Sequence, residues 1–221
     1  SYLSSMVVTG HAHASDGQTN SLAADTLNVT FVRAGEGTQS DPSLVLATGA
    51  VTAKQKDSTL TADTLEAVLE RNINSTTGKR GLEVALATAT GNTRFDRADG
   101  VFASSPRLVA KPTLQLVTLS GPRSAVGQHQ SRIEGNTIAL DGAARTLAVE
   151  GPGSFSHADE SGNQSANASW ASGMTFDDEA NTLYCHGSAQ AAVTTGQTSK
   201  DALATNEITI QLERTPPEIS S

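Results

Sequence analysis

Apolar and polar residues alternate along much of the chain. In "ADTLNVTF" (24–31) the apolar residues Leu27, Val29 and Phe31 occupy every second position, and Ile208 and Ile210 repeat this spacing near the carboxyl end. A period of two predicts half-buried β-strands. Thr and Val are abundant, and Gly, Asn, Asp and Ser recur at short intervals, as in strands separated by turns. The pattern therefore predicts an all-β chain.

One stretch is ambiguous between helix and strand. Between residues 57 and 72, the residues Leu60, Leu65, Val68 and Leu69 could line one face of a helix. The same stretch is similar in sequence to 21–31, where the alternation is clear, and we therefore predict a strand.

A short phrase recurs along the chain. "SLAADTLNV" (21–29) and "STLTADTLEAV" (58–68) match closely, and "IEGNTIAL" (133–140) and "LATNEITIQL" (203–212) keep the same spacing of apolar and polar residues. "FDRADGVF" (95–102) and "WASGMTF" (170–176) are looser matches. The copies begin about 36 residues apart, which indicates about six copies of one supersecondary unit.

The repeated phrase predicts a bend. Leu22 and Leu27 are five residues apart and would point to opposite faces of a straight strand. If both are inside, the strand must bend between them, at Asp25. Asp63, Asn136 and Asn206 occupy the same place in other copies. We interpret these residues as structural corners.

A second phrase, a short apolar run that ends on glycine, precedes several copies. It ends at Gly10, Gly49, Gly121, Gly151 and Gly187. We expect these glycines at strand starts, followed by a short turn, and we interpret "GPG" (151–153) as a hairpin turn.

Composition favours a long, slim molecule. Of the 221 residues, 37% are hydrophobic and only 4% aromatic. This is little apolar surface for a compact, spherical core, but it is enough for an elongated structure in which each repeat covers its neighbour. The net charge of −8 disfavours nucleic acid and anionic membrane surfaces as partners. One cysteine, Cys185, permits no internal disulfide. No run of 18 apolar residues is present to span a bilayer.

Candidate catalytic groups have simpler explanations. We interpret His11 and His13 as exposed histidines on a strand face, because no third metal ligand is evident. Cys185 and His186 are adjacent, so in a strand they point to opposite faces and cannot act as a pair. The carboxylate pairs Asp177–Asp178 and Asp96–Asp99 have the character of turn residues. We predict a protein that is not an enzyme and has no catalytic residue, metal site or cofactor.

The combination of glycine, turn and Leu-x-Ala-Asp-x-Leu resembles the OstA-like superfamily, which contains the lipopolysaccharide-transport proteins LptA and LptC and the amino-terminal domain of LptD. The matching segments are 7–31 and 46–70, with weaker matches at 133–155 and 183–212. The resemblance implies a repetitive antiparallel β-jelly roll of two facing sheets in a V. It also implies a periplasmic location, an apolar groove for lipopolysaccharide or a similar amphipathic lipid, indirect membrane association, and end-to-end stacking with similar domains.

These expectations define a set of interior residues and a domain organisation. Residues 1–213 are predicted to form one elongated domain, with 214–221 as a linker, and any anchor or barrel would lie outside this segment. The predicted interior lining is Leu22, Leu27, Val29, Phe31, Leu60, Leu65, Ile133, Ile138, Leu140, Trp170, Phe176, Leu203, Ile208 and Ile210.

Two alternatives remain open at the level of sequence. One is a structural or adhesive β-solenoid segment of a larger cell-surface protein, which the acidic, Ser/Thr/Ala-rich composition would suit. The other is a carbohydrate-active β-helix enzyme that uses paired carboxylates.

Overall fold

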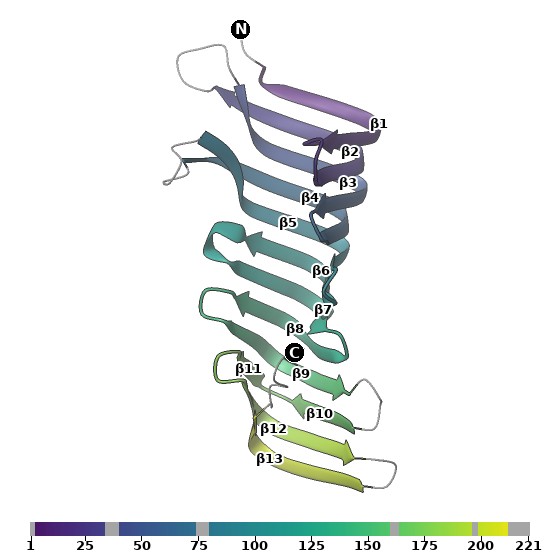
Figure 1. The fold of residues 1–221 in the computed structure, drawn as a ribbon, viewed down its shortest axis with the longest axis vertical. Coiled ribbons are helices and arrows are strands. Elements are labelled where there is room, and N and C mark those ends of the chain that lie inside the picture. Colours follow the sequence, from purple (N-terminus) through teal and green to yellow (C-terminus); the bar gives the residue numbers. More distant parts are fainter. Residues whose placement is uncertain (1–2, 34–39, 74–79, 160–163, 196–198, 212–221) are drawn as a thin grey trace, which may run out of the picture.

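The structure, a computed structural model, describes residues 3–33, 40–73, 80–159, 164–195 and 199–211, and most of them lie in β-strands (Figure 1). The one helical segment within these ranges is a short 3-10 turn, η1 (Pro112–Leu114). The strands are β1 (Ser5–Ser15), β2 (Asn20–Arg33), β3 (Ser40–Gln55), β4 (Ser58–Ile73), β5 (Arg80–Arg97), β6 (Val101–Lys111), β7 (Leu116–Gln128), β8 (Ser131–Asp141), β9 (Thr146–Ala158), β10 (Gln164–Trp170), β11 (Gly173–Asp177), β12 (Thr182–Thr195) and β13 (Ser199–Gln211).

The strands form one 13-stranded antiparallel sheet in which sequence neighbours are usually neighbours in space. From β1 to β10 the order follows the chain. β10 and β11 then lie end to end, and both pair with β9 on one side and β12 on the other. β13 pairs with β12 and forms the far edge. The all-β prediction is confirmed, and the ambiguous stretch 57–72 falls in strand β4.

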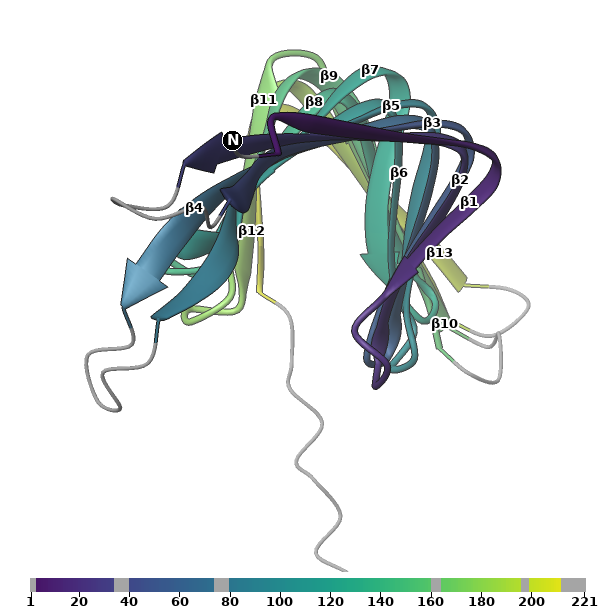
Figure 2. The same ribbon diagram turned by 90° about the horizontal axis from the view of Figure 1, so that it is seen from above.

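Seen along its length, the sheet is folded into a V (Figure 2). Each long strand bends near its middle, so that its two halves lie in two facing walls. The first wall contains the amino-terminal halves of β1, β3, β5, β7, β9 and β12, the carboxyl-terminal halves of β2, β4, β6, β8 and β13, and all of β11. The second wall contains the other halves and β10. The two facing sheets predicted from the resemblance are thus halves of one hydrogen-bonded sheet.

The bends coincide with the predicted corner residues. The strand register shifts between Ala23 and Thr26 of β2, and again around Asp63, Asn136 and Asn206. On the neighbouring strand each shift faces a glycine of positive φ, such as Gly49 with φ +77°. A Cβ on Gly49 would lie 2.3 Å from the Asp25 carboxylate oxygen Oδ2, so glycine is required there both by conformation and by space.

The glycines are not at strand starts, as predicted, but in mid-strand. Gly10, Gly49, Gly121, Gly151 and Gly187 all lie inside their strands, where the left-handed conformation bends the chain without ending its pairing. The "GPG" segment is likewise the corner of β9 and not a hairpin turn.

The prediction for the third copy of the repeat is wrong. The predicted copy 95–102 begins at Phe95, which belongs to the glycine-bearing strand β5. The corner residue equivalent to Asp25 is instead Pro106 on β6. The Pro106 ring lies against Gly121, as Asp25 lies against Gly49. A proline in place of Asp or Asn concealed this copy.

The predicted linker 214–221 lies outside the described residues. The assignment of 1–213 to one domain stays a prediction.

Candidate lipid-binding face

The inner surface of the V carries three continuous rows of apolar side chains. Each row consists of residues that are direct cross-strand partners, so it crosses the sheet from one edge to the other. The first inner row lies on the first wall, next to the corners: Val8, Leu27, Ala47, Leu65, Ala89, Leu108, Leu119, Ile138, Val149, Met174, Cys185 and Ile208. Every member except Val8 is buried.

The second inner row lies two residues further from the corners on the same wall. Its members are Met6, Val29, Val45, Ala67, Ala87, Ala110, Val117, Leu140, Leu147, Phe176, Leu183 and Ile210. Several are only half-buried, including Val45, Ala87 and Leu140. This row is therefore closer to solvent than the first.

The third inner row lies on the second wall. Its members are Ala14, Leu22, Ala53, Leu60, Phe95, Ala103, Val126, Ile133, Phe155, Ala168, Ala191 and Leu203. Without exception the three rows consist of hydrophobic residues. Strand alternation produces them, since every second residue of each half-strand points inward.

All fourteen residues predicted to line the interior lie on this inner face. Twelve belong to the three rows, Phe31 continues the inward side of β2 beyond Val29, and Trp170 lies near the corner of the second wall. Leu203 differs from the rest because it is 57% exposed on the edge strand β13.

Sequence reasoning missed many members of the rows. Leu108, Leu119, Val149, Met174 and Leu183 are as buried as the predicted residues. The alternation around them was a usable signal, but Met174 lies in the loose copy 170–176 and the other four lie in strands that lack a close copy of the repeated phrase.

Buried hydroxyls interrupt the apolar lining at the corner of the second wall. Thr93, Ser105 and Ser124 are buried at 2%, 6% and 0% exposure. Ser105 donates a hydrogen bond to the carbonyl of Arg107 at 2.7 Å, and Ser124 donates to the carbonyl of Gly121 at 2.9 Å. The Thr93 Oγ1 atom is buried without a hydrogen-bond partner, and so is Trp170 Nε1.

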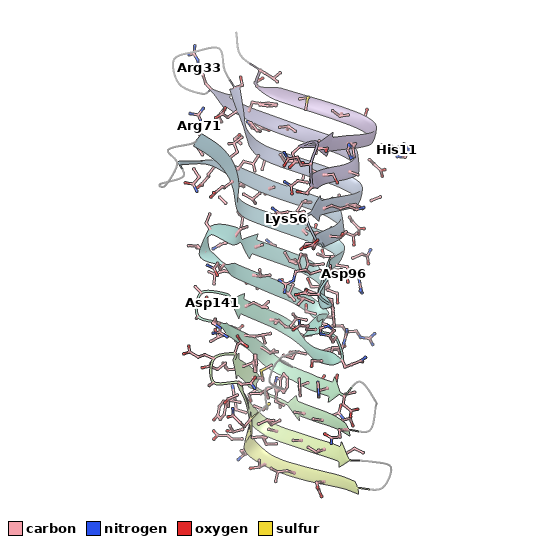
Figure 3. The ribbon with its side chains drawn as sticks, in the orientation of Figure 1. His11, Arg33, Lys56, Arg71, Asp96 and Asp141 are labelled. Carbon is pink, nitrogen blue, oxygen red and sulfur yellow. The ribbon has the colours of Figure 1, made fainter. Side chains whose placement is uncertain are left out.

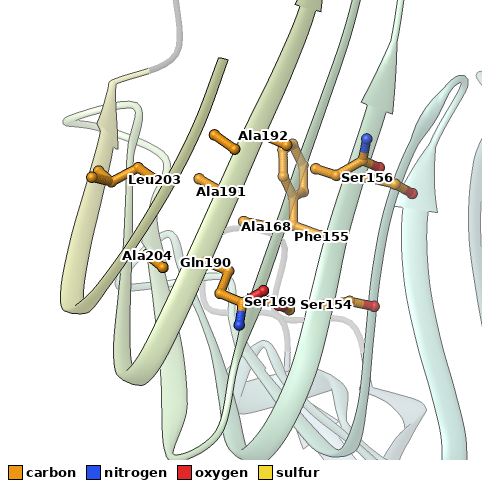
Figure 4. A pocket seen from close by; sticks show the side chains of 12 residues that line it. Ser154, Phe155, Ser156, Ala168, Ser169, Gln190, Ala191, Ala192, Leu203 and Ala204 are labelled. Atoms are coloured by element: carbon orange, nitrogen blue, oxygen red, sulfur yellow. The ribbon is translucent and has the colours of Figure 1, made fainter. Parts of the chain in front are cut away.

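A pocket of about 540 Å³ lies against β9, β10, β12 and β13 (Figure 4). Most of its lining residues, such as Ser154, Ser169 and Gln190, have the outward parity of their strands. The inward residues Trp170 and Ala189 do not line it. The pocket also borders the third inner row, because Phe155, Ala168, Ala191 and Leu203 are among its lining residues. The candidate lipid site is the inner face as a whole, of which this pocket touches one end of one row.

The Cys185–His186 pair is divided between the two faces, as predicted. Cys185 is fully buried in the first inner row, and burial raises the pKa of its thiol to about 11. The outward His186 lies beside the Tyr184 ring, with 6.0 Å between the ring centroids. A hydrogen bond to Glu207 raises the pKa of Tyr184.

The candidate carboxylates are engaged at turns or in ion pairs. Asp177 accepts a hydrogen bond from the Ala180 N–H, and Asp178 pairs with Arg145. Asp96 and Asp99 pair with Arg94 and Arg97. The hydrogen bond from Arg97 lowers the pKa of Asp99. These contacts give each carboxylate a structural role.

Charged side chains lie mainly at hairpin ends and on the outside of the V. Figure 3 shows Arg33, Arg71 and Asp141 near the ends of first-wall strands, and His11 projecting away from the sheet. His11 and His13 are exposed, in agreement with the interpretation of these residues. The described residues contain no cluster of three potential metal ligands. Among the same residues, no helix is long and apolar enough to cross a membrane.

An elongated antiparallel sheet bent into two apolar walls defines an OstA-like β-protein. A family model described as "LptA/(LptD N-terminal domain) LPS transport protein" matches residues 31–146, slightly more than half of the chain. The chain belongs to this family, which is a family of transport proteins.

Two further comparisons complete the picture. No curated protein matches the chain. Among solved structures, the chain is similar to LptH of Pseudomonas aeruginosa, the LptA homologous periplasmic component of the lipopolysaccharide transport device. The sequence identity is 14%, the TM-score is 0.41, and the match covers 66% of this chain and 81% of that one.

Proposed function

We propose that the chain is a periplasmic, non-enzymatic transport domain whose inner face binds the acyl chains of lipopolysaccharide or a similar amphipathic lipid. Membership of the LptA/LptD amino-terminal family supports the transport role. The negative charge of the chain agrees with a lipid partner held by apolar contact instead of by charge.

The observation that carries the proposal is the continuity of the three inner rows. Each runs from β1 to β13 without a polar residue. A hydrocarbon chain lying along such rows would gain about 0.8 kcal/mol for each methylene removed from water. The half-buried members, such as Val45, Leu60 and Leu140, are the ones that a bound chain would reach first.

End-to-end stacking follows from the same rows. They end at two edge strands where inward residues are exposed: Met6 at 42% and Val8 at 37% on β1, and Leu203 at 57% on β13. An edge strand also presents unpaired backbone N–H and C=O groups. A second copy whose β13 paired with β1 would cover the exposed inward residues and the unpaired backbone groups at this junction. It would also extend the apolar rows from one copy to the next.

No catalytic step and no cofactor form part of this function. The acidic pairs are held by arginines or by turn N–H groups, and Cys185 is buried as a neutral thiol. Contact with a membrane would be indirect, through the transported lipid and similar domains.

The test is lipid binding by a variant with a charge on the inner face. Leu140→Asp places a carboxylate in the half-buried second row, and Ala139→Asp places one on the adjacent, exposed outward position. We expect Leu140→Asp to lose lipopolysaccharide binding and Ala139→Asp to retain it, with circular dichroism melting curves confirming that both fold.

Lipid extraction and native mass spectrometry of the protein from a Gram-negative host complete the test. Copurified lipid, with dimers and larger species, is expected. A folded Leu140→Asp variant that still binds lipopolysaccharide would refute the assignment of the inner face. A lipid-free monomer that refuses added lipopolysaccharide would instead favour a structural module.

A further inference from the structure

The inner face is not uniform along its length. In the second inner row, β4, β5 and β6 contribute the consecutive partners Ala67, Ala87 and Ala110. The next three strands contribute Val117, Leu140 and Leu147 to the same row. One stretch of the row thus presents only methyl groups, and the next presents full aliphatic side chains.

The first and third rows show the same tendency, with alanine at four of their eight positions on β3–β6. Ala47, Ala53, Ala89 and Ala103 lie at inward positions of β3, β5 and β6, whereas the three rows contain no alanine on β7, β8 or β9. We call the part of the inner face on β3–β6 the alanine segment. Because protein interiors pack densely, side chains this small leave room that β7–β9 fill with their own side chains.

The alanine segment is also accessible. Ala67, Ala87 and Ala110 are half-buried, and so are Leu60 and Phe95 of the opposite wall. Exposure is similar on β7 and β8, where Val117 and Leu140 of the same row are also half-buried, so the segment is distinguished by the small size of its side chains.

A second, independent feature of this segment points to a ligand. Thr93 lies on β5 between the inward residues Ala89 and Phe95, just past the corner, and it has the inward parity of Phe95. It is 2% exposed, and its hydroxyl has no hydrogen-bond partner. A buried hydroxyl without a partner is unfavourable, and such a group is normally satisfied by protein, water or ligand. The neighbouring Ser105 and Ser124 hydroxyls already donate to backbone carbonyls.

We propose that the alanine segment is the part of the inner face that holds the lipid, and that the Thr93 hydroxyl binds an oxygen atom carried by the acyl chain. The ligand class is a fatty acyl chain that carries a hydroxyl group. The large residues of β7–β9 line the carboxyl-terminal side of this site, where Val117 and Leu140 follow Ala110 in the second row and would contact the bound chain. The inference rests on the proposed function, because it locates the lipid site within the inner face.

The first experiment fills the room that the small side chains of the alanine segment leave on the inner face. Ala87→Leu combined with Ala110→Leu fills the segment, whereas Ala139→Leu makes one such exchange on the exposed outer side. With purified lipopolysaccharide as the probe, we expect affinity to fall about tenfold or more in the filled variant and to remain unchanged in the control. Melting curves establish that both variants fold.

The second experiment removes the hydroxyl. Thr93→Val keeps the shape of the side chain, and Thr88→Val makes the same exchange at an outward position of the same strand. The probes are tetradecanoic acid and a hydroxylated tetradecanoic acid. We expect Thr93→Val to weaken binding of the hydroxylated acid about fivefold, the size of one hydrogen bond, and to leave the plain acid unaffected. Thr88→Val should change neither.

The outcomes separate the two levels of the proposal. A wild-type protein that binds neither lipopolysaccharide nor fatty acid contradicts the proposed function itself. A wild-type protein that binds them, with unchanged affinity in the filled variant and unchanged discrimination in Thr93→Val, overturns the inference and leaves the proposed function standing.

Discussion

At the scale of single residues, alternation assigns each side chain to one face of the sheet. Cys185 lies inside at 0% exposure, between the outward residues Tyr184 and His186. Burial disfavours the charged thiolate and raises its pKa from 9.0 to about 11. The single cysteine is therefore held as an inert, neutral thiol.

The thiol of Cys185 should make stability depend on pH in the alkaline range. Its contribution is fully present below pH 9, the pKa in the unfolded chain, and is lost as pH rises through about 11. The loss should be on the order of 2 kcal/mol. Urea unfolding of the wild type and of Cys185→Ala at pH 8 and pH 11 measures it. The gap between the two proteins should shrink at high pH, and a constant gap would contradict the assignment.

At the scale of the element, the corner is the recurring device of this fold. A glycine of positive φ on one strand faces Asp, Asn or Pro on the next, and the two lie against each other at Gly49–Asp25, Gly91–Asp63 and Gly121–Pro106. The bend keeps residues such as Leu22 and Leu27 on the inner face although they are an odd number of positions apart.

Two glycines allow the contribution of this contact to be measured. Gly10 and Gly49 have nearly the same φ, +78° and +77°, but a Cβ on Gly10 would meet nothing within 4 Å, whereas one on Gly49 would overlap Asp25. Gly10→Ala should cost about 1–2 kcal/mol from the backbone alone. Gly49→Ala should cost at least about 1 kcal/mol more. Denaturant unfolding compares them, and equal costs would argue against the packing of Asp25 on Gly49.

At the scale of the whole molecule, the sheet is a series of strands that mainly contact their neighbours. Such a structure is stabilised locally, and its ends are covered on one side only. β1 illustrates this, since its inward residues Met6 and Val8 are exposed whereas their partners Val29 and Leu27 are buried.

Hydrogen exchange should therefore show a gradient along the molecule. Amides of β1 and β13 should exchange fastest, and those of β7 and β8, with Leu119 and Ile138 at 0% exposure, slowest. If copies stack end to end, protection of β1 and β13 should rise with protein concentration. Edge strands whose exchange is independent of concentration would count against stacking, and the central strands serve as the internal control.

Much of the fold and of the candidate site could be read from local pattern. The alternation predicts strands, and the odd spacing of Leu22 and Leu27 predicts the bend at Asp25. The fourteen predicted interior residues all lie on the inner face, because inward parity is a local property of an alternating strand. The glycines were recognised but misplaced at strand starts, since no local signal shows that pairing continues through a left-handed corner.

The features that only the tertiary structure decided depend on contacts between residues that are far apart in the sequence. Three features depend on which strands pair. They are the corner at Pro106, the end-to-end arrangement of the two short strands β10 and β11, and the union of both walls in a single sheet. The alignment of the alanines of β4, β5 and β6 across the first wall depends on register as well, and so does the placement of the unpartnered Thr93 hydroxyl past the corner of β5. The sequence by itself determined which way each residue faces, because that follows from a period of two. The partners that each residue meets follow from pairing across the sheet, which no local period encodes.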